Sequence, residues 1–386
     1  MTASARANPS SRISSIDLVR GVVMVLMAID HVRVYSGQPA GGPTAGIFFT
    51  RWVTHFVAPG FAFFAGTGAF FHGRKLGDLK ALSRFLVTRG LFLVFLELTV
   101  LRFCWTFNFD YAHYMLAGVI WMLGWCMVLM AGVVRLPLKA IGWLGLILMI
   151  GQNVLGLLNG LPWPLNWVAR IVYLGGNIEL VKGGTNLPIL FVIVPWIGVM
   201  AAGYWFGSVM LRSPEERDRW CLRVGVAATA LFLVLGSIVA IKAGPGPTGR
   251  PFLFRLLGQQ KYPASQLFLM MTLGPTLAFL PLAARARGWL ANAFVTLGRV
   301  PLFYYLLHIP LIHVAAIVVS LIRTGSVTPW LFTNHPLWPP EPPAGYIWPL
   351  PLLYLVFAIC VVLLYFPCRW YAGLKARKTS RWLSFI

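Results

Sequence analysis

The chain has 386 residues, of which 58% are apolar or aromatic and only 11% are charged. An ordinary soluble domain carries about 25% charged residues, so this composition excludes a soluble globular enzyme, and the mean hydropathy of +0.76 excludes a disordered protein. The net charge is +22, but the basic residues lie mostly in short loops between apolar blocks. We therefore interpret them as topology determinants and lipid head-group contacts, with no nucleic-acid partner.

Ten apolar blocks follow one another along the chain, each long enough for a helix of about 20 residues to cross a hydrocarbon layer of about 30 Å. The ninth block contains Pro301 and Pro310 and is expected either to kink or to have an extended interfacial start. The sequence therefore predicts an all-α fold, a polytopic integral membrane bundle of about ten transmembrane helices. The expected helices cover 16–34, 52–71, 82–103, 114–134, 138–158, 187–211, 220–241, 263–284, 294–322 and 346–368.

Loop charge predicts the orientation of this bundle. An even number of helices places both termini on one side, and that side carries eighteen basic loop residues against seven on the other. Because basic loops stay in the cytoplasm, we expect both termini to be cytoplasmic. The expected division is a cytoplasmic N-terminal tail over 1–15, a transmembrane domain over 16–371 and a basic cytoplasmic tail over 372–386.

The first block carries the most informative polar residues. Asp17, Met24 and His31 are spaced by seven residues and share one helix stripe, which Arg20 joins three residues after Asp17. A rise of about 1.5 Å per residue separates Asp17 from His31 by about 21 Å, most of the bilayer. Ionisable groups in such blocks usually face the bundle interior or a wet cavity. The simpler alternatives are a first-turn carboxylate with a cytoplasmic arginine, and a hydrogen-bonded boundary histidine beside Asp30.

Two further histidines are expected at the depth of His31. The second block enters from the outer face with His55, and the fourth begins there with Asp110 and His113. We therefore expect three histidines from three helices in one layer. Imidazole titrates near pH 6.5 and can remove a proton from a hydroxyl or ammonium acceptor, or serve in a proton relay.

The ninth block adds a fourth candidate. His308 lies nine residues, about 14 Å, past Arg299 and should sit near mid-membrane beside backbone groups freed by Pro310. His313 lies about 140° further round the same helix, so these two histidines cannot share a metal ion.

The other ionisable residues predict no site. Glu97 is expected to pair with a basic group, and His72 and His335 are expected on the surface. The sequence contains no metal or phosphate signature, and no metal is expected. Five cysteines without a C-x-x-C spacing are interpreted as small packing residues.

The opening segment resembles a known family. Arg12-Ile-Ser-Ser-Ile-Asp17-Leu-Val-Arg20-Gly21, followed by Asp30-His31, is similar to the opening signature of membrane acyltransferases related to heparan-α-glucosaminide N-acetyltransferase. Further stretches spread along nearly the whole chain are similar to the bacterial branch of this family. They are His55-Phe-Val-Ala-Pro59-Gly60, Lys261-Tyr262-Pro263-Ala264-Ser265 running to Met271-Thr272-Leu273-Gly274-Pro275, and Gly298-Arg299-Val300-Pro301 through Tyr305 to His308.

The resemblance implies an enzyme that takes an acyl group from a coenzyme A thioester on the cytoplasmic side and passes it to a sugar on the far side. The animal heparan enzyme has a catalytic histidine in the loop after the first helix, but residues 34–50 here contain none. His31 aligns with an asparagine of that enzyme, so the chemistry is expected to carry over while the heparan substrate is not. The coenzyme A phosphates could be held by basic residues of the inner face. These residues are Arg12, Arg20, Arg74, Lys75 and Arg84.

From this resemblance and the polar residues we assign roles. His31 would be the general base or acyl carrier, helped by Asp30, while His55 and His308 would polarise the thioester carbonyl or hold the acceptor. An acyl-histidine intermediate and direct transfer are both open. The expected donor is acyl-CoA, with acetyl as the acyl group, and the residues expected to bind it are Arg12, Asp17, Arg20 and Arg299. Those expected to bind the acceptor are Arg33, His113, Tyr262 and Tyr305.

The expected partners are membrane lipids, a coenzyme A thioester and a sugar-type envelope acceptor, and a homodimer is left open. The expected location is the inner membrane of a bacterium, as a multi-pass protein.

The alternative function is a transporter of a sugar, lipid or proton-coupled solute, because a helical bundle with intramembrane histidines could also serve that purpose.

Overall fold

The computed structural model describes residues 14–42, 44–162, 164–246, 249–336 and 341–377. Within these ranges the chain is mostly helical, and it adds one short hairpin of two antiparallel strands, β1 (Gly176–Glu179) and β2 (Asn186–Ile189). The helices are α1 (Ser14–Tyr35), α2 (Ala45–Trp52), α3 (Val57–Leu76), α4 (Leu79–Leu96), α5 (Arg102–Thr106), α6 (Val119–Val133), α7 (Leu138–Gly151), α8 (Leu165–Ala169), α9 (Trp196–Val209), α10 (Pro214–Ala243), α11 (Phe252–Leu257), α12 (Gln266–Arg285), α13 (Trp289–Arg299), α14 (Pro301–Thr324) and α15 (Leu350–Ala376). Short 3-10 or π-helical turns lie at Val53–Phe56, Glu97–Leu101, Gln152–Leu158, Arg170–Leu174 and Pro329–Phe332.

The architecture is that of a multi-pass integral membrane protein. Helices α7, α10 and α15 expose apolar side chains such as Ile147, Val239 and Val362, as helices facing lipid do. Among the described residues, six helical segments are long and apolar enough to cross a membrane. They are Ala45–Leu76, Leu138–Leu158, Pro214–Ala243, Gln266–Arg285, Pro301–Thr324 and Leu350–Ala376.

The remaining four expected spans correspond to α1, α4, α6 and α9. Helices α1 and α4 carry several charged residues, and α6 and α9 have only 15 and 14 residues. The number of ten spans and the cytoplasmic termini therefore stay predictions.

The chain breaks near the start of the ninth apolar block, at the first of the two prolines at which a kink was predicted. Helix α13 ends at Arg299, Val300 has a non-helical backbone (φ −131°, ψ 50°), and Pro301 begins α14. Proline lacks an N–H group and disfavours helical backbone in the residue before it, so a new helix starts there. Pro310 stays inside α14.

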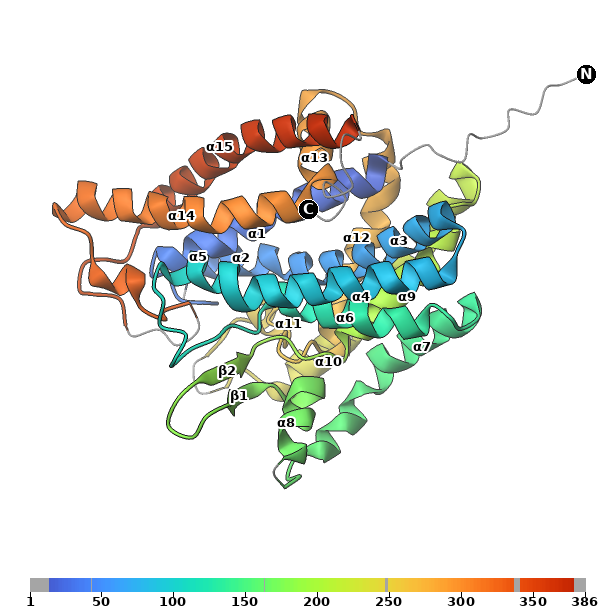
Figure 1. The fold of residues 1–386 in the computed structure, drawn as a ribbon, viewed down its shortest axis with the longest axis horizontal. Coiled ribbons are helices and arrows are strands. Elements are labelled where there is room, and N and C mark those ends of the chain that lie inside the picture. The colour runs from blue at the N-terminus through green and yellow to red at the C-terminus, as the bar shows by residue number, and fades with distance from the viewer. Residues whose placement is uncertain (1–13, 43, 163, 247–248, 337–340, 378–386) are drawn as a thin grey trace, which may run out of the picture.

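Two other blocks become helical later than expected. The blocks at 114–134 and 187–211 form α6 only from Val119 and α9 only from Trp196. The preceding residues are extended, and the Met115 N–H donates to the Asn186 carbonyl in β2 at 3.0 Å. These segments and the hairpin form a non-helical layer beside one end of the bundle (Figure 1).

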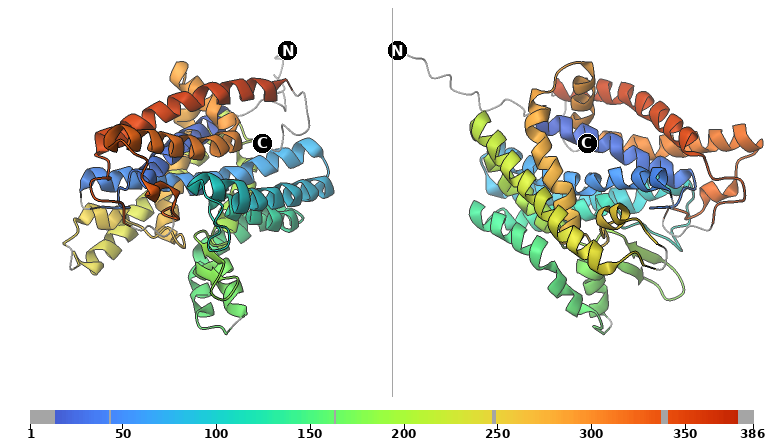
Figure 2. Two further views of the ribbon diagram at one scale, coloured as in Figure 1. Left: turned by 60° about the vertical axis from the view of Figure 1, so that its left-hand side comes forward. Right: turned by 180° about the vertical axis from the view of Figure 1, so that it is seen from behind.

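Helices far apart in sequence lie side by side. Helices α1, α14 and α15 lie together in Figure 1, α3 packs on α9 and α4 on α6, and Figure 2 shows α10 running along α12. Helix α1 approaches α13 most closely through glycine. A Cβ atom added at Gly298 would lie 1.7 Å from the Asp17 carbonyl oxygen, and one at Gly21 would lie 1.9 Å from that of Phe294. Such backbone contact leaves no room for a side chain.

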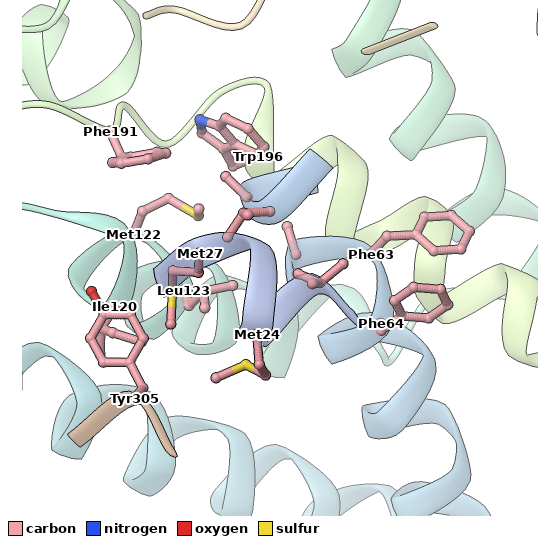
Figure 3. Packing of buried hydrophobic residues seen from close by; sticks show 14 of the residues in the cluster. Met24, Met27, Phe63, Phe64, Ile120, Met122, Leu123, Phe191, Trp196 and Tyr305 are labelled. Atoms are coloured by element: carbon pink, nitrogen blue, oxygen red, sulfur yellow. The ribbon is translucent and has the colours of Figure 1, made fainter. Parts of the chain in front are cut away.

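The centre of α1 is packed with apolar side chains. Met24 and Met27 are buried between the two polar ends of the helix, in the same core as Phe64, Ile120 and Tyr305 (Figure 3). Methionine is flexible enough to repack around different neighbours. The stripe that joins Asp17 to His31 is therefore filled by an adaptable side chain.

Candidate active site

An imidazole pair lies at the His31 end of α1. The Nδ1 atom of His31 is 2.6 Å from the Nε2 atom of His308 in α14, and the ring centroids are 4.8 Å apart in a stacked arrangement. The ring of Trp105 packs edge-on against His31 at 4.7 Å. Two of the expected catalytic residues are therefore in direct contact, although they come from opposite ends of the chain.

The backbone of α14 fixes which nitrogen of each ring carries the proton. The Nδ1 atom of His308 lies 2.6 Å from the carbonyl oxygen of Tyr305. A carbonyl oxygen only accepts, so this Nδ1 must donate, and in neutral imidazole the Nε2 atom then accepts. His31 must therefore donate from its Nδ1, which leaves a lone pair on its Nε2 atom. His308 is fully buried whereas His31 is partly exposed, so His31 is the member of the pair that can take up a proton.

A carboxylate with two arginines stands beside this pair. Asp30 accepts from Arg33 Nε at 2.8 Å through one oxygen and from Arg51 Nη1 at 2.7 Å through the other. Arg33 also donates to the carbonyl oxygen of Gln38 at 2.7 Å, and the Gln38 amide donates to that of Trp348. The network ties the end of α1 to α2 and to the segment before α15, and it holds His31 in place.

A loop between α11 and α12 brings Lys261 and Tyr262 to the same cluster. The Lys261 ammonium interacts electrostatically with Asp30, His31 and Arg51, and its Nζ atom lies 5.6 Å from the centre of the Phe191 ring. Burial lowers the pKa of Lys261. Tyr262 lines a cavity of about 270 Å³ under the hairpin, together with Pro263, Gly175, Gly176, Pro188 and Ile189.

Sequence reasoning missed Arg51 and Lys261 as site residues. Lys261 was interpreted as a loop charge that sets topology, and Arg51 was given no role at the start of the second block. A signal for Arg51 was present, because it begins the second block at the depth expected for Asp30. Lys261 stood in one of the family-like stretches, but nothing local linked it to His31.

The other proposed site residues take different positions. His55 lies next to the charged cluster, with its Nδ1 atom 3.1 Å from the carbonyl oxygen of Arg51, and the Tyr305 ring packs against both His31 and His308. His113 points outward with 71% of its side chain exposed and pairs with Asp110 at 2.6 Å. The described residues show no contact between His113 and the imidazole pair, so His308 takes the place in the layer that was expected for His113.

Two expectations about other ionisable residues were wrong. Glu97 has no basic partner within salt-bridge distance among the described residues; one of its oxygens accepts from the backbone N–H groups of Ile120 and Trp121. It caps the start of α6, where backbone donors lack helical partners. His335 is only 3% exposed rather than on the surface, because its ring packs on Trp330 at 4.1 Å.

A second charged cluster lies at the Asp17 end of α1. Asp17 is buried and lies 3.9 Å from the Nε atom of Arg299. Arg20 donates to the carbonyl oxygen of Phe64 and lies within electrostatic range of Arg89. Arg12, expected to join this end, lies outside the described residues. Arg299 therefore lies beside the Asp17 carboxylate, and Arg20 and Arg89 lie within electrostatic range of each other. Guanidinium groups suit the recognition of phosphate groups.

The comparisons with known proteins add a family. The family model described as heparan-alpha-glucosaminide N-acetyltransferase, catalytic, matches residues 12–240. A search of curated proteins finds no match. The matched region contains Asp30, His31 and His55, whereas Lys261 and His308 lie beyond it. Within the described ranges, no three His, Cys, Asp or Glu side chains gather as metal ligands would.

Proposed function

Because the chain belongs to the heparan-alpha-glucosaminide N-acetyltransferase catalytic family, and so to membrane enzymes of the acetyltransferase type, we propose that it moves an acyl group from acyl-CoA to a sugar or other acceptor of the cell envelope. The observation that carries this proposal is the imidazole pair, in which the Nε2 atom of His31 is left to accept a proton. Acetyl is the proposed acyl group, in keeping with the family.

The proposed chemistry is base-assisted acyl transfer. The Nε2 atom of His31 removes the proton from the acceptor hydroxyl or amine as that atom attacks the thioester carbonyl carbon. His308 positions His31 and fixes its tautomer, as the orienting member of a catalytic triad does. Asp30 lies next to His31 and stabilises the positive charge that the imidazole gains. When the carbon–sulfur bond breaks, the proton passes to the departing sulfur and gives free CoA.

The donor is proposed to bind from the Asp17 end. Arg20 and Arg299 supply cations for the phosphates of coenzyme A, and Asp17 holds Arg299 in place. The pantetheine arm would then follow α1 towards His31, a span of about 21 Å along the helix. Met24 and Met27 occupy that route and would repack around the arm.

The acceptor is proposed to bind under the hairpin. Tyr262 lines the cavity there and reaches the charged cluster, and Tyr305 forms an apolar wall beside the imidazoles. Arg33 would act by holding Asp30, and His55 and His113 would hold the acceptor on its way in. Arrival from this side fits a donor that enters from the opposite end of α1.

The orientation and location follow as parts of the same proposal. The basic loops support cytoplasmic termini. We propose with this a transmembrane acyltransferase domain over 16–371 that lies in the inner membrane of a bacterium. In that orientation the Asp17 end faces the cytoplasm, where acyl-CoA is made, and the His31 end faces the envelope.

The test uses the purified full chain with labelled acetyl-CoA and a panel of sugar acceptors. Acceptor-dependent release of CoA is expected in the wild type, with a loss of about 10²–10⁴-fold in His31→Ala and a smaller loss in His55→Ala. His72→Gln is the matched histidine control, since His72 lies in α3 against the ring of Phe85, outside the site. Equal CoA release by the wild type and His31→Ala would overturn the proposal.

A further inference from the structure

We propose that Lys261 is the residue that stabilises the negative charge on the thioester carbonyl oxygen during acyl transfer. The inference rests on the proposed function and extends it to a residue whose only other assigned feature is loop charge. Three observations lead to it: the charge balance of the cluster, the surroundings of the ammonium group, and its place between the imidazoles and the cavity.

The charge balance leaves Lys261 as the available cation. Asp30 is the carboxylate of this cluster, and both of its oxygens are occupied by Arg33 and Arg51. In the described parts of the chain, no carboxylate oxygen lies within 4.0 Å of the Lys261 ammonium, which interacts with the side chain of Tyr262 instead. A cation held beside a catalytic base without an anion of its own is suited to meet negative charge that appears only during a reaction.

The surroundings of Lys261 strengthen its effect. Its Nζ atom lies 5.6 Å from the ring centre of Phe191 and 5.2 Å from that of Tyr262. Aromatic faces attract an ammonium group without neutralising it. Lys261 is only partly exposed, and the interaction between a cation and an oxyanion is stronger where water is scarce.

The backbone fixes the position of Lys261. The residue lies in a tight turn, where Lys261 bridges to Ala264 and the Ser265 N–H donates to the Gln260 carbonyl at 2.9 Å. Ser265 then caps α12 through its side chain. The next two residues, Tyr262 and Pro263, line the cavity under the hairpin, while the ammonium interacts with His31 and His55. Lys261 therefore stands between the proposed base and the proposed acceptor site.

The step in which Lys261 acts is the attack on the thioester. The acceptor atom forms a bond to the carbonyl carbon and gives its proton to His31, while the carbonyl π electrons move onto oxygen. The Lys261 ammonium donates a hydrogen bond to that oxyanion. The pair then returns, the carbon–sulfur bond breaks, and the sulfur takes the proton from His31, so that acylated acceptor and CoA–SH leave with no net change in protons.

Protonation of Lys261 gives this role a pH signature. Burial lowers its pKa from the ordinary 10.5, so the ammonium is lost on raising the pH earlier than from an exposed lysine. The charged and titratable groups that face it are Tyr262, Arg51, Asp30, His31 and His55. Arginine stays protonated throughout this range, so Lys261→Arg should retain activity at alkaline pH where the wild type has lost it.

The experiment compares Lys261→Met and Lys261→Arg with Lys242→Met, an exposed lysine at the end of α10. For Lys261→Met we expect kcat to fall about 10²–10³-fold with the KM for acetyl-CoA little changed, and for Lys261→Arg we expect partial recovery and an alkaline limb at higher pH. Lys242→Met should behave as the wild type.

The outcomes separate this inference from the proposed function. If the wild type turns over acetyl-CoA and Lys261→Met matches its kcat, or if the alkaline limb of Lys261→Arg coincides with that of the wild type, Lys261 has no such role while the acyltransferase stands. If the wild type releases no CoA with any acceptor, the proposed function and this inference fail together. Should Lys261→Met fail to fold, the pH profile of Lys261→Arg decides alone.

Discussion

The Nδ1 atom of His31 and the Nε2 atom of His308 lie 2.6 Å apart and join α1 to α14 across 277 positions of sequence. The Tyr305 carbonyl behind His308 gives this contact a direction, because it makes His31 the donor within the pair and leaves its other nitrogen as an acceptor. The two imidazoles therefore form one unit with one available base.

Because His31 and His308 form one unit, the losses of activity from mutating each of them are not expected to add. His31→Ala and His308→Ala should each lower kcat by about 10²–10⁴-fold, and the double variant should be no less active than His31→Ala alone, because His308 acts only by orienting the His31 base. Steady-state CoA release under saturating acetyl-CoA measures this. Losses that multiply in the double variant would show that the two histidines act separately.

Asp30 predicts a large effect on stability. Asp30→Asn removes the charge that compensates Arg33 and Arg51, whose side chains are only 10% and 14% exposed. Breaking a buried ion pair on one side costs about 3–5 kcal/mol, so thermal unfolding in detergent should occur at a clearly lower temperature. Asp110→Asn breaks an exposed pair with His113 and should cost less than about 1 kcal/mol. Equal effects of the two changes would contradict this account of the cluster.

The charged cluster at the Asp17 end predicts different effects of one mutation on two acyl donors, acetyl-CoA and acetyl-pantetheine. Arg299→Ala should raise the KM for acetyl-CoA about tenfold or more, since a charged hydrogen bond contributes about 1.5–3 kcal/mol. The KM for acetyl-pantetheine, which lacks the phosphates, should not change. Arg287→Ala, an exposed arginine between α12 and α13, is the control. A similar rise for both donors would place the phosphates elsewhere.

The contact between α1 and α13 predicts strict size limits. Gly298→Leu would force a side chain into the Asp17 backbone, 1.7 Å from its carbonyl oxygen. Overpacking costs about 1–3 kcal/mol or more and should also separate Arg299 from Asp17. A Cβ atom added at the exposed Gly132 in α6 meets no atom within 4 Å, so Gly132→Leu should be tolerated. Thermal unfolding of both variants tests the prediction, which fails if Gly298→Leu is as stable as the wild type.

His335 predicts that stability falls in acid. Burial lowers its pKa from 6.5 to about 3. Between these two pH values the histidine is protonated in the unfolded chain and neutral in the folded chain. The neutral ring contributes stability that is fully present above pH 6.5 and is lost progressively as the pH falls towards 3. Between pH 7 and 5 the loss amounts to about 2 kcal/mol.

The check is the unfolding temperature of the full chain across this pH range. His335→Gln should flatten the dependence, while His113→Gln, an exposed histidine, should leave it as in the wild type. A wild-type curve that His335→Gln does not alter would assign the acid sensitivity to another group.

The helices were predictable because the length of each apolar block can be counted directly in the sequence. Helix α1, the break at Pro301 and the lipid-facing α10 all follow from local residue types. The late start of α6 was not predictable in this way. The residues just before α6 are apolar enough for a helix, but Tyr114 and Ala117 pair with strand β2, 72 positions further along the chain.

The site was predictable as a set of residues and not as an arrangement. His31 and His308 stood out because imidazoles are costly in apolar helices, yet only the docking of α14 on α1 makes them partners. Lys261 lies in a loop, where positive charge has an ordinary topological explanation. His335 follows a stretch of mixed polarity, and its burial depends on Trp330 folding over it.

The long separation of His31 from His308 bears on how shortened genes should be interpreted. A fragment that stops at residue 240 keeps the whole region that the family model matches. It lacks His308, the imidazole that orients the His31 base. Such a truncated product would match the acyltransferase family and be inactive. During synthesis the active site is complete only when α14 has entered the membrane.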